Sequence, residues 1–239
     1  MSGIGETDDP VGLMIGAEPH EFSGILKHAR DIETISWKGA AWARKARVGL
    51  GNESWILLAN GAGPRLVQRM LGSETAEQWS GRGRISRLLS VGLCGALDPA
   101  LRVGDIVISG TAFARATGSF VEGRIYSVDR VIVEAAEKAS LYRETGCSAV
   151  EMESAAVEQA AEDWGVAYGA VRVVSDRATE ELPLDFNDYR DMDGNFQVPR
   201  IVWAALRNPF RGLPWLVRLG RNSNIANERL GEFLANCEF

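Results

Sequence analysis

Residues 147–165 read CSAVEMESAAVEQAAEDWG, an apolar strand followed at once by an alanine-rich helix. Glu151 and Glu153 stand at the junction, where a buried strand should end. Glutamate is rarely fully buried without a partner. The residues alone leave two explanations open. The acids lie in the first turn of a helix, where the helix dipole favours them, or they line a binding site at the strand end.

The same alternation of strand and helix runs through most of the chain. Predicted strands are 11–17, 54–63, 85–97, 105–114, 148–152 and 166–176. Predicted helices are 19–30, 64–72, 130–146 and 154–165. Strands that are apolar on both faces and alternate with helices are typical of a sheet covered by helices. We therefore predict one three-layer α/β/α domain over residues 11–239, with a central mixed, mostly parallel sheet.

The two ends of the chain differ from this pattern. Residues 1–10 are polar and acidic, which predicts a loose tail and not a signal peptide. Residues 177–195 are rich in acids and predict a loop or lid. From about Val198 the chain predicts helix, with Pro209 and Pro214 as breaks.

The segment 201–224 is basic and apolar in a chain that is acidic overall. It has no Asp or Glu, and its large apolar side chains are Trp203, Phe210, Leu213, Trp215, Leu216 and Leu219. Such a segment suits peripheral contact with a membrane. It suits equally a helix packed on the core or on a neighbouring subunit, which is the commoner outcome.

Composition excludes several classes of function. The net charge of -6 argues against nucleic acid as a partner, because phosphate binding requires a basic face. The three cysteines, Cys94, Cys147 and Cys237, are scattered, which suits a reducing cytoplasm and predicts neither a disulfide framework nor a metal site. There is no apolar run long enough to span a membrane. A Rossmann-type dehydrogenase is a poor match, since no GxGxxG follows the first strand.

Polar residues and glycines gather after the predicted strands. In sheets of this type the ligand lies at the carboxyl ends of the strands. The residues there are Glu21, Gly61, Gly63, Gly92, Gly95, Glu151, Glu153 and Asp176. We therefore predict a single site lined by carboxylates and glycine loops.

Five ordered blocks carry a family resemblance that covers roughly residues 11–180. They are IGAEPHE (15–21), NGAG (60–63), VGLCGALDPALRVGDIVIS (91–109), AVEMESAA (149–156) and VRVVSDRA (171–178). Together they resemble the nucleoside phosphorylase and nucleosidase superfamily. The first block is similar to the methylthioadenosine/S-adenosylhomocysteine nucleosidases. Residues 127–154 look more like phosphorylase-like proteins of hopanoid biosynthesis, which are thought to release adenine from adenosylhopane.

The resemblance implies roles for four residues. Asp176 would protonate or hydrogen-bond N7 of a purine, although an aspartate there would also suit a helix N-cap. Glu153 would accept hydrogen bonds from the ribose 2′- and 3′-hydroxyls above Met152, which would form an apolar floor. Glu21 would activate water. The alternative, given equal weight, is that Glu21 is simply an exposed glutamate on a helix.

Other positions are implied to contact the substrate. These are Gly92, Cys94, Gly95, Val131 and Ser175. Leu93 stands where many relatives have Ser or Thr, and Val131 and Ile132 replace an aromatic-aliphatic pair over the base. Gly61, Gly63 and Arg65 could hold an anion through backbone N–H groups, although glycine at such a turn usually serves geometry alone. We expect structural roles for Glu151, Arg172 and Asp105, and a surface position for His20.

The implied function is release of the free base from a 5′-modified adenosine-type nucleoside, by hydrolysis rather than phosphorolysis. The alternatives are an adenosylhopane-cleaving enzyme and a non-catalytic nucleoside- or lipid-binding protein on the same fold. No metal or organic cofactor is implied, and inorganic phosphate is the one co-substrate to consider. The partners implied are a small nucleoside and further copies of the chain in a homo-oligomer.

Overall fold

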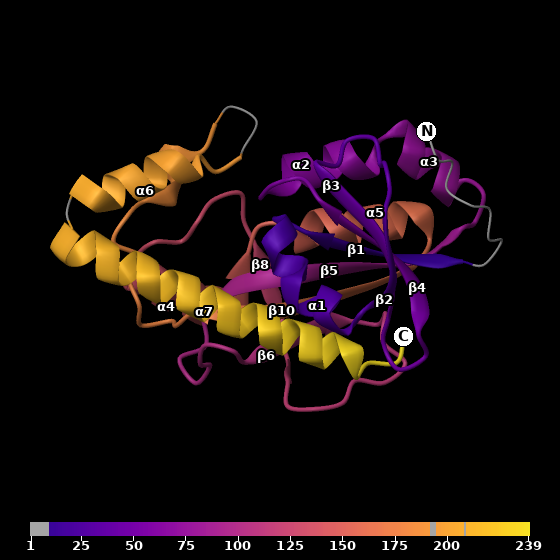
Figure 1. Cartoon of the computed structure of the whole chain (residues 1–239). Coiled ribbons are helices and arrows are strands. Elements are labelled where there is room, and N and C mark those ends of the chain that lie inside the picture. The colour runs from indigo at the N-terminus through magenta and orange to yellow at the C-terminus, as the bar shows by residue number, and fades with distance from the viewer. Residues whose placement is uncertain (1–9, 192–194, 208) are drawn as a thin grey trace.

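One mixed β-sheet forms the centre of the protein, as Figure 1 shows for this computed structural model, in which residues 10–191, 195–207 and 209–239 are described. The described strands are β1 (Val11–Gly16), β2 (Arg30–Thr34), β3 (Trp42–Val48), β4 (Glu53–Ala59), β5 (Ile85–Ala96), β6 (Ile106–Gly110), β7 (Val121–Glu122), β8 (Ile125–Ser127), β9 (Ala149–Glu151) and β10 (Ala167–Asp176). Their order is β2-β3-β4-β1-β5-β10-β6-β7, with β9 pairing β5 and β8. The mixed, mostly parallel sheet predicted from the sequence is confirmed.

A parallel core of four strands positions the site. β4, β1, β5 and β10 are neighbours and run in the same direction. Their carboxyl ends therefore lie at one edge of the sheet, where the polar residues of the sequence pattern follow each strand. β3 and β6 run antiparallel to this core on its two sides, and β2 lies beyond β3.

Helices cover both faces of the sheet. They are α1 (Ser23–His28), α2 (Pro64–Leu71), α3 (Glu74–Ser80), α4 (Ala135–Thr145), α5 (Ser154–Trp164), α6 (Val198–Arg207) and α7 (Pro209–Ala235), with 3-10 turns η1 (Pro19–Phe22) and η2 (Phe186–Tyr189). Figure 1 shows α1 and α7 on one face and α2, α3 and α5 on the other. In β1, Met14 belongs to the hydrophobic cluster on the face covered by α1 and α7. Leu13 and Ile15 belong to the cluster on the face covered by α2, α3 and α5. The period of two in a strand explains why β1 is apolar throughout.

Several predicted boundaries were wrong. The helix expected over 19–30 ends at His28, and the exposed strand β2, with the sequence RDIET, follows it. A charged edge strand lacks the apolar pattern that identifies buried strands. The helix expected from 130 starts only at Ala135.

The C-terminal prolines behave differently from each other. Pro209 opens α7, as a proline at a first helical position can. Pro214, expected to break the helix, lies inside α7. Pro214 has no N–H and so removes one main-chain hydrogen bond, but α7 continues past it to Ala235.

Two further predictions concern the chain ends and the membrane. The predicted tail lies outside the described residues for positions 1–9. None of the helices in the described ranges combines the length and apolar character needed to cross a membrane.

Candidate active site

A cavity of about 460 Å³ lies at the carboxyl ends of the parallel strands. It brings together most of the residues predicted from the sequence, which come from separate segments. Those that line it are Glu21, Cys94, Gly95, Val131, Met152, Glu153, Ser175 and Asp176. Exposed His20 also lines it. Their convergence depends on sheet order, since β1, β5 and β10 are adjacent although distant in sequence.

The two glutamates of the opening stretch have different surroundings. Glu151 is buried and accepts hydrogen bonds from the N–H groups of Glu153 (2.9 Å) and Ser154 (2.9 Å), and so it caps the start of α5. It also pairs with Arg172 at 2.5 Å. Glu151 ends β9 and Glu153 directly precedes α5, so neither acid lies in the first turn of that helix, as the first explanation required. Both acids line the cavity, and Glu151 also has the structural role expected of it.

Glu153 is a buried carboxyl held by one amide and one cation. Its Oε1 accepts a hydrogen bond from the Gly63 N–H at 2.8 Å, and its Oε2 lies 3.4 Å from Nη1 of Arg172. Burial raises the pKa of Glu153 to about 8, against the opposing effect of the Arg172 charge. A sugar that donates hydroxyl protons would favour its ionised form.

Arg172, which we expected to be only structural, lies fully buried behind the carboxylates. Its Nη2 donates to Ser90 Oγ at 2.5 Å. Burial opposes its charge, but Glu151, Glu153 and Glu21 outweigh this effect and raise its pKa above the usual arginine value. Its Nε and Nη1 have no hydrogen-bond partner among the described residues. The sequence signal was an arginine inside the apolar run VRVVSD, because an unpaired buried charge is costly.

Glu21 is buried and not an exposed helix residue. Its Oε2 accepts from the N–H groups of Ala17 (2.7 Å) and Glu18 (3.0 Å), and its Oε1 accepts from the Leu93 N–H (3.0 Å). Gly92 keeps the space beside it, since a Cβ there would lie 2.7 Å from Glu21 Oε1 and 3.0 Å from Arg172 Nη1. Glu21 and Arg172 therefore crowd the position that a side chain at residue 92 would take.

Asp176 ends β10 and points to the cavity with 15% of its side chain exposed. Its Oδ1 lies 2.8 Å from Ser175 Oγ, and its Oδ2 lies 2.5 Å from Nζ of Lys138. Gly95 leaves room for this carboxylate, because a Cβ there would approach Oδ2 to 3.1 Å. Asp176 is therefore half of an ion pair, which the sequence pattern did not reveal.

The anion site suggested for Gly61, Gly63 and Arg65 does not form as expected. The Gly61 N–H donates to the Ala17 carbonyl at 2.7 Å, and the Gly63 N–H donates to Glu153. Both amides are already used by oxygens of the protein. The exposed Arg65 lines a different pocket.

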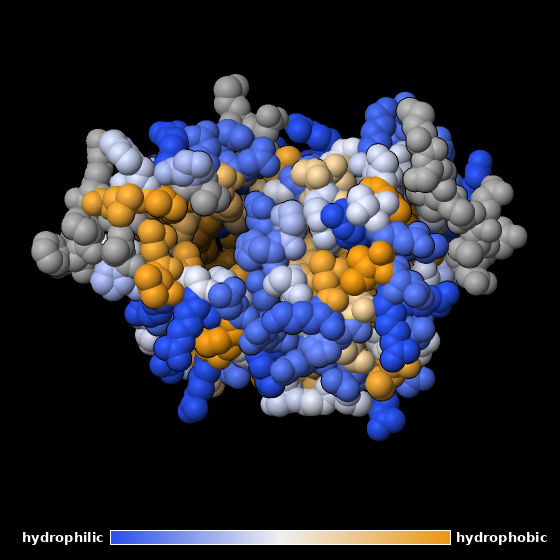
Figure 2. Space-filling view, in the orientation of Figure 1, coloured by the Kyte–Doolittle hydropathy of each residue, from blue (hydrophilic) through white to orange (hydrophobic). Residues whose placement is uncertain are grey.

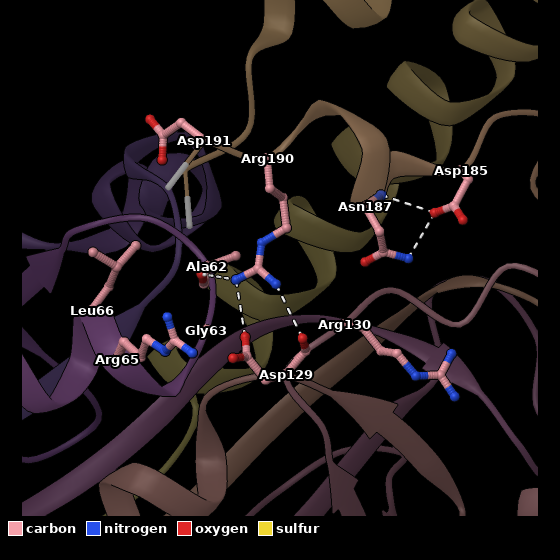
Figure 3. A pocket seen from close by; sticks show the side chains of 10 residues that line it. All are labelled: Ala62, Gly63, Arg65, Leu66, Asp129, Arg130, Asp185, Asn187, Arg190 and Asp191. Carbon is pink, nitrogen blue, oxygen red and sulfur yellow. Dashed lines mark hydrogen bonds and ion pairs between the residues drawn. The ribbon is translucent and has the colours of Figure 1, made fainter. Parts of the chain in front are cut away.

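That second pocket, of about 560 Å³, is charged with both signs (Figure 3). Arg190 lies in its middle and donates to the Asp129 side chain (3.0 Å) and to the Ala62 carbonyl (3.2 Å). Asp185 and Asp191 line it together with Arg65. The mixture of charges does not favour a free anion there.

The outer part of the main cavity is apolar. Phe186, Phe196, Ile201, Leu216 and Leu219 line it, from η2, α6, α7 and the chain between them. Figure 2 shows hydrophobic side chains around a hollow on the side of α6 and α7. The side chains of Phe210 and Leu213, named in the sequence prediction, lie outside the described residues.

Val131 and Met152 pack together at the edge of the cavity. The segment that carries Val131 is tied to η2, because the Val131 N–H donates to Asn187 Oδ1 (2.9 Å) and Asn187 Nδ2 donates to the Val131 carbonyl (3.0 Å). The acidic stretch thus forms part of the wall. Closure as a lid stays a prediction, and residues 192–194 of it lie outside the described residues.

No cluster of three or more His, Cys, Asp or Glu in the described part of the chain is arranged to hold a metal ion. Cys94 offers its main chain rather than its thiol, since its carbonyl lies 3.1 Å from Ser175 Oγ and burial raises the pKa of its thiol. The polar side chains that line the cavity include carboxylates, the His20 imidazole, the Arg130 guanidinium and the Ser175 hydroxyl.

Comparisons with known proteins bear on the family and the fold. The Phosphorylase superfamily profile matches residues 111–207. The chain is 31% identical over 216 residues to the 5′-methylthioadenosine/S-adenosylhomocysteine nucleosidase of Geobacillus thermodenitrificans, covering 74% of this chain and 88% of that protein.

Solved structures have the same fold. The futalosine hydrolase of Helicobacter pylori has a TM-score of 0.63 at 18% identity, with 94% of this chain and 95% of that one covered. The 5′-methylthioadenosine/S-adenosylhomocysteine nucleosidase of the same organism has a TM-score of 0.61 at 17% identity, with 95% and 96% covered. These relatives do not bear on the hopanoid-associated branch, which stays a prediction.

Proposed function

The chain belongs to the nucleoside phosphorylase and nucleosidase superfamily, and we propose that it hydrolyses the N-glycosidic bond of a 5′-modified adenosine-type nucleoside and releases the free base. The observation that supports this most directly is the convergence of Glu21, Glu153 and Asp176 on one cavity, each held by different partners. Three carboxylates with separate surroundings can take separate roles in one reaction. The named relatives include hydrolases of nucleosides, which is the same reaction class.

Each carboxylate has a role that its contacts suit. Asp176 faces the cavity from the end of β10 and would deliver a proton to the purine as it leaves. Glu153 would accept hydrogen bonds from the ribose hydroxyls and stabilise the positive charge that develops on the sugar. Met152 would lie against the sugar as an apolar surface.

Glu21 would activate the attacking water. It lines the cavity, and a water there would give its proton to Glu21 as it attacks the sugar. Arg172 is fully buried and would hold the carboxylates Glu151 and Glu153 in place.

Water is favoured over phosphate by two observations. The N–H groups of Gly61 and Gly63 donate to protein oxygens and are not free to bind an anion. Leu93 has no hydroxyl, and its N–H donates to Glu21. The groups that would bind phosphate are thus engaged or missing.

The apolar outer cavity supports an apolar 5′ substituent. Burial of each CH₂ there would contribute about 0.8 kcal/mol. Peripheral membrane contact through 201–224, a homo-oligomer and a cytoplasmic location stay predictions. Light scattering would measure the oligomeric state, and sedimentation with vesicles would test the membrane contact.

The test is release of adenine from 5′-deoxy-5′-methylthioadenosine and from adenosine, with and without phosphate. We expect release that does not depend on phosphate. Glu21→Gln should abolish it, and Asp176→Asn should lower kcat by about 10²–10⁴-fold while ligand affinity is largely kept. Glu122→Gln, an exposed glutamate on β7, serves as the matched control. Release that requires phosphate would contradict the hydrolytic proposal.

A further inference from the structure

Helix α4 buries a lysine where most helices bury an apolar residue. Lys138 is 0% exposed and is the buried side chain of this helix. An ammonium group taken out of water costs several kcal/mol unless its hydrogens find acceptors. Such a residue needs an explanation beyond packing.

Lys138 has three acceptors for its three protons. Nζ donates to Asp176 Oδ2 (2.5 Å), to the Arg177 carbonyl (3.1 Å) and to the Glu180 carbonyl (3.0 Å). A carbonyl oxygen can only accept, so two N–H groups of Lys138 are used by Arg177 and Glu180. The third N–H of the ammonium points to the Asp176 carboxylate, with which Lys138 forms an ion pair.

The other oxygen of Asp176 has a partner that can change. Ser175 Oγ lies 2.8 Å from Asp176 Oδ1 and 3.1 Å from the Cys94 carbonyl. A hydroxyl has one proton, so Ser175 can donate to only one of them at a time. When Asp176 is protonated, Ser175 can turn to Cys94. Asp176 thus has Lys138 as a proton source on one side and, on the other, the Ser175 hydroxyl, which can change its hydrogen-bond partner.

We propose that Lys138 is a positioning residue that supplies the proton which Asp176 passes to the departing base. This inference rests on the function proposed above. As the C1′–N9 bond breaks, its electron pair goes to the purine. Lys138 gives a proton to the Asp176 carboxylate, and the carboxyl formed gives its proton to N7, so Asp176 is again a carboxylate and Lys138 is a neutral amine. The attacking water gives its hydroxyl to C1′ and its proton to Glu21. The cycle closes when Glu21 releases that proton to solvent and Lys138 regains one by way of Asp176.

The test compares leaving groups that need a proton with one that does not. Lys138→Met has nearly the same length and no charge. We expect it to lower kcat for adenine release by at least about 100-fold with little change in KM. Cleavage of 4-nitrophenyl β-D-ribofuranoside, whose nitrophenolate leaves as a stable anion, should change less than about fivefold. Lys27→Met, which removes an exposed lysine paired with Glu228, is the matched control. An equal loss for both leaving groups would show a structural role only and overturn the inference.

A second variant keeps the test decisive if the methionine variant does not fold. Lys138→Arg keeps the positive charge, but a guanidinium does not release its proton in proteins. Loss of adenine release in Lys138→Arg, with a normal circular dichroism melt, supports proton supply. An active arginine variant overturns it, because charge alone would then suffice. A wild-type protein that releases no base would overturn the proposed function and this inference together, whereas active wild type with active Lys138 variants overturns this inference alone.

Discussion

Replacing Glu153 by glutamine should change how the stability of the protein depends on pH. The buried carboxyl has its pKa raised from 4.5 to about 8 in the folded protein. The folded state therefore keeps a proton on Glu153 in the pH range where the unfolded chain has lost it. For a raised pKa, the stabilising contribution is fully present below pH 4.5 and is lost as pH rises toward 8.

The magnitude follows from the width of this window. Each pH unit between 4.5 and about 8 should lower the free energy of unfolding by about 1.4 kcal/mol, so the whole window is worth roughly 5 kcal/mol. Glutamine has the shape of a protonated glutamate and does not titrate. Its Oε1 can still accept from the Gly63 N–H. Near pH 5, Glu153→Gln should be about as stable as the wild type, and by pH 8 it should be several kcal/mol more stable.

Chemical denaturation at pH 5, 6, 7 and 8 would measure this difference through tryptophan fluorescence. Glu122→Gln, exposed on β7, should follow the wild type at every pH. Parallel curves for wild type and Glu153→Gln would refute the reasoning, since Glu153 would then titrate in the folded protein as it does in the unfolded chain. The reasoning would also be refuted if the stability of Glu153→Gln, relative to the wild type, fell as pH rises.

Three further perturbations test the site and its surroundings. Affinity for a ribonucleoside ligand should rise with pH up to about 8, because the sugar hydroxyls donate to ionised Glu153, and calorimetry at pH 6 and 8 would measure it. Gly92→Ala should cost about 1–3 kcal/mol of stability and most of the activity. The reasons are that φ at Gly92 is +140° and that the new methyl would lie 2.7 Å from Glu21 Oε1. An unchanged melting temperature would contradict this prediction. Trp203→Ser, at a side chain 55% exposed, should weaken sedimentation with anionic vesicles, whereas equal sedimentation of both proteins, or none by the wild type, would count against membrane contact.

The edges of the fold show where reasoning from sequence was weak. The buried strands β1, β4, β5 and β10 were predictable, because residues apolar on both faces have few other locations. Strand β2 was missed, since its exposed charged residues carry no burial pattern. The prediction for Pro214 was wrong, because a proline removes one main-chain hydrogen bond and need not end a helix that continues beyond it.

The site divides in the same way. Apolar strand patterns, glycine turns and the acids that follow them are local features, and they were enough to predict the sheet and the edge at which Glu21, Glu151, Glu153 and Asp176 meet. The choice of Glu21, Glu153 and Asp176 among these acids came from the family resemblance. The partners of those acids could not be predicted, because they come from distant segments: Arg172 between Glu151 and Glu153, the Gly63 N–H on Glu153, and Lys138 behind Asp176. Charge and burial at a carboxylate depend on what packs within a few ångströms of it, and that is settled by the path of the chain through space.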